Sequence, residues 1–551
     1  MAASEHRRLI IVSNRLPFSA SVVESEVLFS GVAGGLATGL TAFLDSYKDH
    51  FPKSEDHLWV GWPGSTIDEP LRAHVRERAL AEYRACPVFL SEADMENFYL
   101  GFCNKTIWPL FHYFPTYAEY NDDYWDQYRR VNELFCETLS EIVHEGDAVW
   151  IQDYHLMLLP SLLRKRIPRA LIGVFLHIPF PSFEIFRLLP LQWRRGILEG
   201  LLGADLIGFH TYEYTHHFLQ SVLRVLGHDH SMGQISLPHR VVKADTFPMG
   251  IDYGRFVEAS SDAQTEAEKQ ELRKALGEVK VILSVDRLDY SKGIPHRLEA
   301  YEQLLETYPD VRGKVVLVMV VVPSRIGVDR YELMKKQVEE SVGKINGKYG
   351  SISWTPVIYQ YKLLSLNPLV ALYSIADVAL VTPLRDGMNL IAKEYLASRT
   401  DGTGVLILSE MAGAAKELGE AIIINPNDRA EIAAALKEAL EMPDAEQIRR
   451  SRAMQNRLKR YDVVRWASDF FTELSATKEI QEKLNAKLLE PTVFKLIGES
   501  YRRATRRLLL LDYDGTLTPL VRRPDLAAPS PTILELLASL AGEPNSTLVL
   551  I

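Results

Sequence analysis

Short apolar runs recur along the chain, separated by stretches whose apolar residues have helical spacing. The runs are rich in β-branched residues and apolar throughout, as is typical of parallel strands covered on both faces. Strands that alternate with helices predict right-handed βαβ units in open, doubly wound α/β sheets. The strands that we expect are residues 8–14, 148–153, 171–179, 204–210, 279–286, 315–323, 376–383 and 404–409.

The order of these elements indicates more than one domain. The chain has 551 residues, whereas a single core usually stops growing at about 250 to 300 residues. Pro and Gly residues in the segment 247–256 predict a crossover between two series of strands. We expect two Rossmann-like domains, 1–246 and 247–475, then a charged helical connector, 476–507, and a further α/β segment, 508–551.

Composition narrows the class of protein. Hydrophobic residues make up 47% and charged residues 24% of the chain, as in ordinary folded proteins. The formal net charge of −10 argues against nucleic-acid and acidic-membrane partners, because both need a basic face. The apolar runs fall far short of a signal-peptide core or the ~20 residues of a membrane helix. We therefore expect a cytoplasmic protein that binds anionic substrates through a few local cations.

Candidate ligand-binding residues follow strands of the second domain, because ligands of doubly wound sheets bind beyond the carboxyl ends of strands. Arg287 and Lys292 follow the strand 279–286, beside a glycine. Two cations there suit a diphosphate whose negative charge grows as its bond to a sugar breaks. The alternative interpretation is a solvated surface loop.

A second group follows the strand 376–383. Gly387 and Asn389 approach a helix N-terminus, which offers free backbone N–H groups to a phosphate. Asp386 is placed to accept hydrogen bonds from sugar hydroxyls. Glu394 lies inside the same helix, where the alternative is an ordinary exposed acidic residue.

The first domain contributes candidates at its own strand ends. Arg15 follows the first strand, and Gly34 and Gly35 precede a helical run, where a turn is the alternative to a ligand loop. Asp153 and His177 end later strands, and a structural histidine is the alternative for His177. Arg325 follows the strand 315–323 and is a candidate for a second phosphate. Aromatic rings that could cover a sugar, or else pack in the core, are Trp59, Trp62, Tyr99, Trp108, His112 and Tyr113.

Seven segments resemble, in order, the signature blocks of the trehalose-6-phosphate synthase family. They are SNR with AGGL, FYLGFCNKTIWPLFHY, QDYHL, LHIPFPSFEIFR, SVDRLDYSKG, INGKYG and TPLRDGMNLIAKEY, and the resemblance covers roughly residues 8–469. It implies a GT-B fold, in which two Rossmann-like domains face each other across a cleft. It also implies a metal-independent, retaining transfer of glucose from UDP-glucose to glucose 6-phosphate, which gives trehalose 6-phosphate and UDP.

The resemblance also implies roles for single residues. Arg287 and Lys292 would bind the diphosphate of UDP, and Glu394 its ribose. The donor glucose would be held by Asp386 and by the backbone of Gly387, Met388, Asn389 and Leu390. The acceptor phosphate would be held by Arg15, Tyr99 and Arg325, and the acceptor sugar by Trp108 and Asp153. Gly34 and Gly35 would form the loop between acceptor and donor, with His177 near the reacting carbon.

The expected mechanism follows from the residue types. A double-displacement retaining enzyme needs a carboxylate nucleophile behind the anomeric carbon, and the seven segments offer none that we can name. We therefore expect a same-face transfer in which Arg287 and Lys292 stabilise the departing diphosphate. An oxygen of that diphosphate would take the proton of the acceptor hydroxyl, and no cofactor would be needed.

The segment LLLLDYDGTLTP, residues 508–519, is similar to the opening motif of haloacid-dehalogenase-type phosphatases, including trehalose-6-phosphate phosphatase. Asp512 and Asp514 would provide a nucleophile and an acid/base there, with Mg²⁺ between phosphate and carboxylates. The later lysine and acidic cluster of that family would lie beyond Ile551. We therefore expect an incomplete phosphatase-like segment without phosphatase activity, from a longer bifunctional parent or a truncation.

Two alternatives to a synthase stay open. The first is a non-catalytic sugar-phosphate sensor, which would bind UDP-glucose without forming product. The second is a related glucosyltransferase with another phosphorylated acceptor, such as glycerol 3-phosphate. The sequence also leaves the oligomeric state open, a homo-oligomer included.

Overall fold

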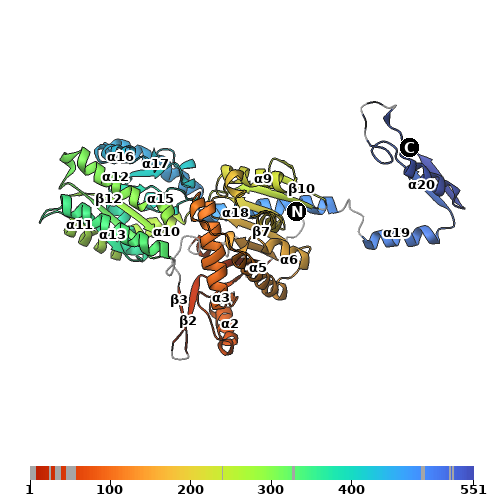
Figure 1. Cartoon of the computed structure of the whole chain (residues 1–551), viewed down its shortest axis with the longest axis horizontal. Helices are drawn as coiled ribbons and strands as arrows, with labels where there is room; N and C mark the ends of the chain where they lie inside the picture. Colours follow the sequence, from red (N-terminus) through yellow and green to blue (C-terminus); the bar gives the residue numbers. More distant parts are fainter. Residues whose placement is uncertain are drawn as a thin grey trace. The chain divides into compact units, whose positions relative to one another are not determined.

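A computed structural model describes residues 8–23, 26–31, 39–44, 57–238, 240–324, 329–485, 491–519, 521, 523 and 526–551. The chain forms two compact units, Met1–Ile480 and Gln481–Ile551. The first unit contains two large sheets, each with its own surrounding helices (Figure 1). A membrane-spanning segment is absent from the described helices, each of which is too short or too polar for one.

The first sheet has the strand order β5-β4-β1-β6-β7-β8-β11-β10-β9. Its strands from β5 to β11 pair in parallel, with Leu9 opposite Ala148, and antiparallel pairing joins β11, β10 and β9. The strands are β1 (Leu9–Arg15), β4 (His57–Trp62), β5 (Ala85–Pro87), β6 (Ala148–Gln152), β7 (Leu171–Leu176), β8 (Leu206–Phe209), β9 (His230–Ser231), β10 (Gln234–Leu237) and β11 (Arg240–Thr246). A separate hairpin is formed by β2 (Phe18–Val23) and β3 (Glu26–Gly31).

Helices cover the first sheet on both faces. They are α2 (Glu69–Tyr83), α3 (Glu92–Asp94), the π-helix η1 (Met95–Ile107), α4 (Trp108–Phe111), α5 (Asp122–Ile142), α6 (Leu159–Arg166), α7 (Phe183–Phe186), α8 (Leu191–Leu201) and α9 (Tyr212–Leu226), with 3₁₀ turns η2 (Pro115–Tyr117) and η3 (Tyr154–Leu156). The apolar face of α5 shows how the pattern works, because Tyr128, Val131, Phe135 and Leu139 are all completely buried against the sheet.

The second sheet is parallel throughout, in the order β14-β13-β12-β15-β16-β17. Its strands are β12 (Lys280–Arg287), β13 (Val315–Val322), β14 (Val357–Tyr361), β15 (Val378–Val381), β16 (Val405–Ser409) and β17 (Ile422–Ile424). Its helices are α10 (Tyr253–Ser260), α11 (Ala263–Leu276), α12 (Ile294–Thr307), α13 (Asp329–Tyr349), α14 (Leu366–Ile375), α15 (Leu390–Ser398), α16 (Arg429–Glu441) and α17 (Asp444–Arg460), with 3₁₀ turns η4 (Tyr290–Lys292), η5 (Pro309–Val311) and η6 (Gly413–Lys416).

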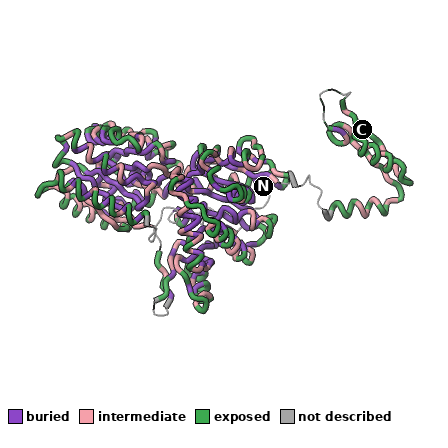
Figure 2. The backbone as a smooth tube through the Cα atoms, viewed as in Figure 1, coloured by how far each residue is buried: buried purple, intermediate pink, exposed green. Residues whose placement is uncertain are grey.

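Both sheets reverse their strand order at one point, which is where open α/β sheets form a ligand crevice. In the first sheet the reversal lies at β1, between β4 and β6, and in the second at β12, between β13 and β15. The central strands of both sheets are buried on both faces (Figure 2). The expected α/β fold with doubly wound sheets is confirmed.

The helix α18 (Val463–Asn485) follows the second sheet in sequence but packs on the first, where Figure 1 shows it beside β7. The amide of Val463 donates to the carbonyl of Ile251 at 3.1 Å, so two crossings of the chain lie side by side. Trp466 and Phe470 are completely buried, and the indole of Trp466 lies 5.2 Å from that of Trp150 in β6. This packing joins the two sheets in one compact unit.

The second unit contains a single described βαβ arrangement. Its strands β18 (Arg507–Leu511) and β19 (Ser546–Leu550) pair in parallel, and α20 (Pro531–Gly542) lies between them in sequence. The helix α19 (Pro491–Arg503) precedes them.

Candidate active site

The loop after β12 is held against the loop after β15. Asp289 is completely buried and accepts a hydrogen bond from the amide of Ser291 at 2.9 Å, which starts the short turn η4. Gly293 has a φ of 66°, and a Cβ atom there would lie 2.7 Å from the carbonyl oxygen of Thr382. Glycine is therefore required for the close approach of the two loops, which brings Lys292 toward the residues that follow β15.

Lys292 and Asp386 form a buried ion pair. The Nζ atom of Lys292 donates to Oδ2 of Asp386 at 2.5 Å, and Nδ2 of Asn389 donates to the same oxygen at 3.1 Å. Burial alone would raise the pKa of Asp386, but the charge and hydrogen bond of Lys292, the charge of His112 and the amide of Asn389 hold it below its ordinary value. Asp386 therefore stays charged at neutral pH, in the place where sequence analysis expects a diphosphate and a sugar.

The approach to α15 has an unusual backbone. Asn389 has a φ of 75°, and its Oδ1 atom accepts from the amide of Ala392 at 3.2 Å, which caps the helix. A Cβ atom at Gly387 would collide with the carbonyl oxygen of His177 in the first sheet. The residues Gly387 to Leu390 thus lie directly against the carboxyl end of β7, with Met388 buried.

Glu394 is half-buried and is not the ordinary exposed residue of the alternative interpretation. The hydroxyl of Tyr373 donates to its Oε2 atom at 3.0 Å. Burial raises the pKa of Glu394 to about 7, although this hydrogen bond and the charge of Arg255 oppose the shift. The carboxyl group is therefore fixed in position and suited to accept hydrogen bonds from a ribose.

Asp153, which directly follows β6, has a strained backbone. Its φ of 69° and ψ of 177° lie in a region that is essentially restricted to glycine, and such strain concentrates at functional sites. Its Oδ1 atom accepts from the amide of His177 at 3.1 Å. Burial raises its pKa to about 6, opposed by the amides of His177, Tyr154 and Ile178 and by the charge of Arg287. The positive charge of Arg287, the last residue of β12, therefore favours the ionised form of Asp153.

His177 is uncharged in this environment. Its Nε2 atom lies 2.9 Å from Oε1 of Gln152, and its ring centroid is 5.3 Å from that of His210. Burial lowers the pKa of His177 well below its ordinary value, and His210 lowers it further. The same desolvation lowers the pKa of His210 to about 3. His177 can therefore exchange hydrogen bonds with a sugar but does not supply a cationic charge.

The aromatic candidates divide between the site and the core. Trp59 is buried in the core, where its Nε1 atom donates to Oγ of Ser13 at 2.7 Å, so the core alternative holds for this ring. Trp108 and His112 stack with centroids 4.0 Å apart, and burial lowers the pKa of His112 to about 3. The ring of Tyr113 lies 4.2 Å from the guanidinium of Arg385.

Trp108 joins the two sides of the site. The guanidinium carbon of Arg287 lies 5.6 Å above its ring, and its Nε1 atom donates to Oδ1 of Asp289 at 3.4 Å. The structure therefore brings an expected acceptor-side residue against the expected diphosphate-binding loop.

Arg15 and Tyr99 form a neighbouring group on the first sheet. Arg15 is exposed, donates to Oγ of Ser19 at 2.7 Å and lies 5.7 Å from the ring of Trp62. That ring is 6.5 Å from Tyr99, which stacks on His155 at 6.0 Å. The remaining expected residues, Gly34, Gly35 and Arg325, lie outside the described residues.

Sequence analysis missed a contact across the two sheets. The hydroxyl of Tyr214 in α9 donates to the carbonyl of Asp386 at 3.1 Å, and Arg385 lies 3.4 Å from Glu213. Tyr214 and Glu213 carry no local signal of this role, because they belong to an amphipathic helix whose spacing predicts only packing.

In the second unit, Asp512 and Asp514 follow β18 and are exposed, as the phosphatase-like motif predicts for a strand end. The hydroxyl of Thr516 donates to Oδ2 of Asp512 at 2.8 Å. Carboxylates are the ligand type that Mg²⁺ prefers. Among the described residues, however, no group of three His, Cys, Asp or Glu side chains is placed so that it could hold a metal ion.

The molecule has two Rossmann-like sheets. A buried lysine and an arginine lie at the strand ends of one sheet, and an aspartate and a histidine lie at those of the other. This arrangement is that of a glycosyltransferase of the GT-B class. The chain belongs to glycosyltransferase family 20, whose family model matches residues 7–476.

Named relatives agree with this membership. The chain is 48% identical over 550 residues to the bifunctional trehalose-6-phosphate synthase/phosphatase of Thermoproteus tenax, covering 99% of this chain and 74% of that protein. It is 41% identical over 539 residues to the UDP-forming α,α-trehalose-phosphate synthase A of Dictyostelium discoideum, covering 98% and 72%.

Solved structures are similar over most of the chain. One is an α,α-trehalose-phosphate synthase of Burkholderia xenovorans in complex with glucose-6-phosphate, with 33% identity, a TM-score of 0.75 and coverage of 85% of this chain and 100% of that one. Another is the E. coli structure bound with UDP-2-fluoro glucose, with 36% identity, a TM-score of 0.75 and coverage of 85% and 98%. The expected GT-B fold is confirmed.

Proposed function

We propose that this chain transfers glucose from UDP-glucose to glucose 6-phosphate with retention, and so forms trehalose 6-phosphate and UDP. The observation that carries the proposal is the buried pair of Lys292 and Asp386. Lys292 lies in the loop that follows Arg287, and Asp386 is next to Gly387, which lies close to His177 at the end of the first sheet. Family membership supports the reaction, and the relatives solved with glucose-6-phosphate and with UDP-2-fluoro glucose support the two substrates.

The donor would lie over the second sheet. Arg287 and Lys292 would neutralise the diphosphate, whose charge grows as the bond to glucose breaks. Asp386 and the backbone of residues 387–390 would orient the glucose, and Glu394 would accept from the ribose hydroxyls. Because Asp386 already holds Lys292, the cation is fixed before the substrate binds.

The acceptor would lie over the first sheet. Arg15 and Tyr99 would hold its phosphate, with Trp108 and Asp153 beside the sugar; Arg325, Gly34 and Gly35 keep their expected roles as predictions. His177 would face the reacting carbon as a neutral hydrogen-bonding group, in agreement with its lowered pKa.

The step itself would be a same-face transfer. The glycosidic bond to the diphosphate breaks, the acceptor oxygen bonds to the same face of the anomeric carbon, and a diphosphate oxygen takes the acceptor proton. Arg287 and Lys292 would stabilise the charge that develops, so most of the catalysis would be positioning and electrostatics. We propose that this step needs no metal or other cofactor, since two side chains already supply positive charge.

The test is to mix the purified chain with UDP-glucose and glucose 6-phosphate, with and without a chelator, and to follow UDP and the sugar product. We expect UDP and trehalose 6-phosphate in equal amounts at an unchanged rate with chelator. Glycerol 3-phosphate as the accepted substrate would favour the related transferase. UDP-glucose binding without UDP release would favour the sensor. A cytoplasmic location and a homo-oligomer stay predictions.

A further inference from the structure

Arg297 is an unusual residue of α12, because its side chain is completely buried. Its guanidinium donates to Oγ1 of Thr382 at 3.0 Å, to Oδ2 of Asp286 at 2.8 Å and to the carbonyl of Lys292 at 3.0 Å. It also donates to the hydroxyl of Ser284. Arginine has five N–H donors in a fixed planar fork, so the side chain reaches several fixed acceptors at once.

Three of the four acceptors of Arg297 adjoin the donor site. Asp286 is the residue before Arg287 in β12. The second acceptor is the backbone of Lys292 itself. Thr382 directly follows β15, at the start of the loop that leads to Asp386. Arg297 therefore connects the backbone beside Arg287, the backbone of Lys292 and the start of the loop that contains Asp386.

A second set of contacts closes the same junction. The amide of Leu384 donates to the carbonyl of Ser291 at 2.7 Å, and Lys292 pairs with Asp386. Two ion pairs thus lie at this junction, Arg297 with Asp286 and Lys292 with Asp386. Burial raises the pKa of Asp286, and the charges of Arg297 and Lys292 oppose the shift.

Stability alone does not account for this arrangement. Desolvation of a buried ion pair can exceed its Coulombic gain, so such a pair is weak evidence for stabilisation. What a planar, multiply bonded guanidinium does supply is a fixed geometry. Here that geometry is the spacing between Arg287, Lys292 and Asp386.

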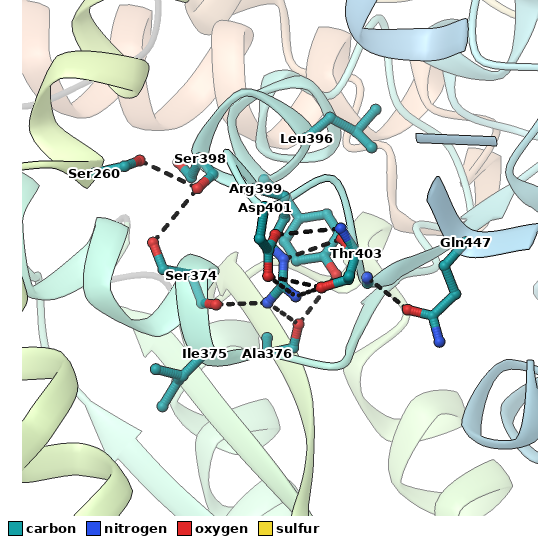
Figure 3. A network of polar contacts seen from close by, with 12 residues as sticks. Ser260, Ser374, Ile375, Ala376, Leu396, Ser398, Arg399, Asp401, Thr403 and Gln447 are labelled. Carbon is teal, nitrogen blue, oxygen red and sulfur yellow. Dashed lines mark hydrogen bonds and ion pairs between the residues drawn. The ribbon is translucent and has the colours of Figure 1, made fainter. Parts of the chain in front are cut away.

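The same half of the unit contains a matched arginine with no such neighbours. Arg399 is also buried, and it donates to the carbonyls of Thr403 at 3.1 Å and Ala376 at 2.8 Å and to Asp401 at 2.9 Å (Figure 3). Figure 3 shows this network at the end of α15, where its acceptors are loop and helix-end groups. Arg399 is the structural counterpart against which Arg297 can be compared.

We propose that Arg297 is a positioning residue for donor binding: it acts through Arg287 and Lys292, and does not touch the substrate itself. The inference rests on the proposed function, because it takes the ligand of these two cations to be the diphosphate of UDP. Replacing Arg297 by Lys would keep the charge but lose the fork, so both cations would lose their fixed spacing.

The experiment compares Arg297→Lys with Arg399→Lys. Both variants should lower Tm, since each loses hydrogen bonds to buried acceptors. Arg297→Lys should also weaken UDP binding, measured by calorimetry, by about tenfold. It should lower kcat on the order of 100-fold, because small misplacements at a reacting centre are costly. The KM for glucose 6-phosphate should change little, and Arg399→Lys should bind UDP normally.

Equal UDP affinity in Arg297→Lys and the wild type would overturn the inference, and so would an equal loss in both variants. Absence of UDP binding by the wild type would instead refute the proposed function. These two failures are therefore distinguishable.

A double-mutant cycle adds a second readout. If Arg297 acts through the two cations, Arg297→Lys should lower kcat much less in a Lys292→Ala background than in the wild type. Full additivity would contradict the inference. If Arg297→Lys does not fold, Thr382→Val removes a single acceptor of the same guanidinium. A folded Thr382→Val protein should then bind UDP more weakly, and unchanged binding would overturn the inference.

Discussion

The strand ends of the first sheet and those of the second sheet both place polar groups in a buried site, but they stabilise these groups in different ways. The second sheet presents charges in pairs, Lys292 with Asp386 and Arg297 with Asp286. The first sheet presents groups whose pKa values are shifted by burial toward the neutral form: His177 has a lowered pKa, and Asp153 has a pKa raised to about 6.

This difference matches the two halves of the proposed reaction. A departing diphosphate gains negative charge, which fixed cations stabilise. An acceptor sugar reacts through a neutral hydroxyl, which a neutral imidazole and a carboxyl group can orient through hydrogen bonds. The comparison therefore assigns charge stabilisation to the second sheet and orientation to the first.

The largest expected effect comes from removing charge on the second sheet. Arg287→Ala should lower kcat about 10³-fold, since removing one preorganised group that stabilises transition-state charge typically has this effect. The fold should persist, because Arg287 is exposed at the end of β12. Steady-state kinetics with a Tm measurement checks both points. Lys344→Ala, which removes an exposed lysine of α13, is the control and should be silent. Near-normal turnover of Arg287→Ala would contradict the assignment of charge stabilisation to the second sheet.

The junction of the two sheets should be nearly as sensitive. In Gly387→Ala the new methyl group would collide with the carbonyl oxygen of His177, so the two sides of the site must separate. We expect kcat/KM to fall on the order of 100-fold, in line with a misplacement of reacting groups. The matched control is Gly419→Ala, where a Cβ atom meets nothing within 4 Å. Equal activities of the two variants would mean that the observed approach of Gly387 is not needed for catalysis.

The first sheet can be tested through the proton on Asp153. Its pKa is about 6 in the folded protein and ordinarily 3.8, so the folded state keeps a proton that the unfolded state has lost between these values. Stability from this group is therefore present below about pH 4 and is lost as the pH rises through about 6. Asp153→Asn stays neutral and has nearly the same shape, so the backbone strain at this position should be unchanged.

We therefore expect the Tm of Asp153→Asn minus that of the wild type to rise between pH 5 and pH 8, by on the order of 1–2 °C. If Asp153 holds the acceptor, the KM for glucose 6-phosphate should be higher in Asp153→Asn than in the wild type. A Tm difference that stays constant with pH would show that Asp153 is not held with a raised pKa, and would weaken the contrast between the two sheets.

Sequence reasoning found most of the central strands of both sheets, but it missed the buried strand β4 and several strands nearer the ends of the sheets. The central strands β7, β13 and β15 are buried on both faces, and a continuous apolar run marks such strands. By contrast, β11 and β14 are partly exposed and carry polar residues such as Lys243 and Gln360, which interrupt the run. The physical reason that these two strands were missed is thus their partial exposure, which requires no continuous apolar pattern.

The same limit applies to the site. Arg287, Lys292, Asp386 and Asp153 could be found because they end strands, where a general rule places ligands. Arg297 could not, because within a helix it has the appearance of an ordinary solvated charge. Its burial depends on how α12 packs against the sheet, which no local pattern records. The contact of Tyr214 with Asp386 spans 172 residues and depends equally on tertiary packing.

The smallest expected effect concerns that contact, which joins the two sheets through one hydrogen bond. Tyr214→Phe removes only the hydroxyl that donates to the carbonyl of Asp386. A single neutral hydrogen bond contributes about 1 kcal/mol, so kcat should fall only about five- to tenfold. Tyr301→Phe is the matched control. The hydroxyl of Tyr301 donates to the carbonyl of Pro356 at 3.0 Å, and both residues belong to the half of the unit that contains the second sheet. Both variants should lose similar stability in a Tm measurement, whereas only Tyr214→Phe should slow turnover. If both variants slowed turnover equally, the loss would be explained by the lower stability of the protein. The hydrogen bond between Tyr214 and Asp386 would then have no separate role in positioning Asp386.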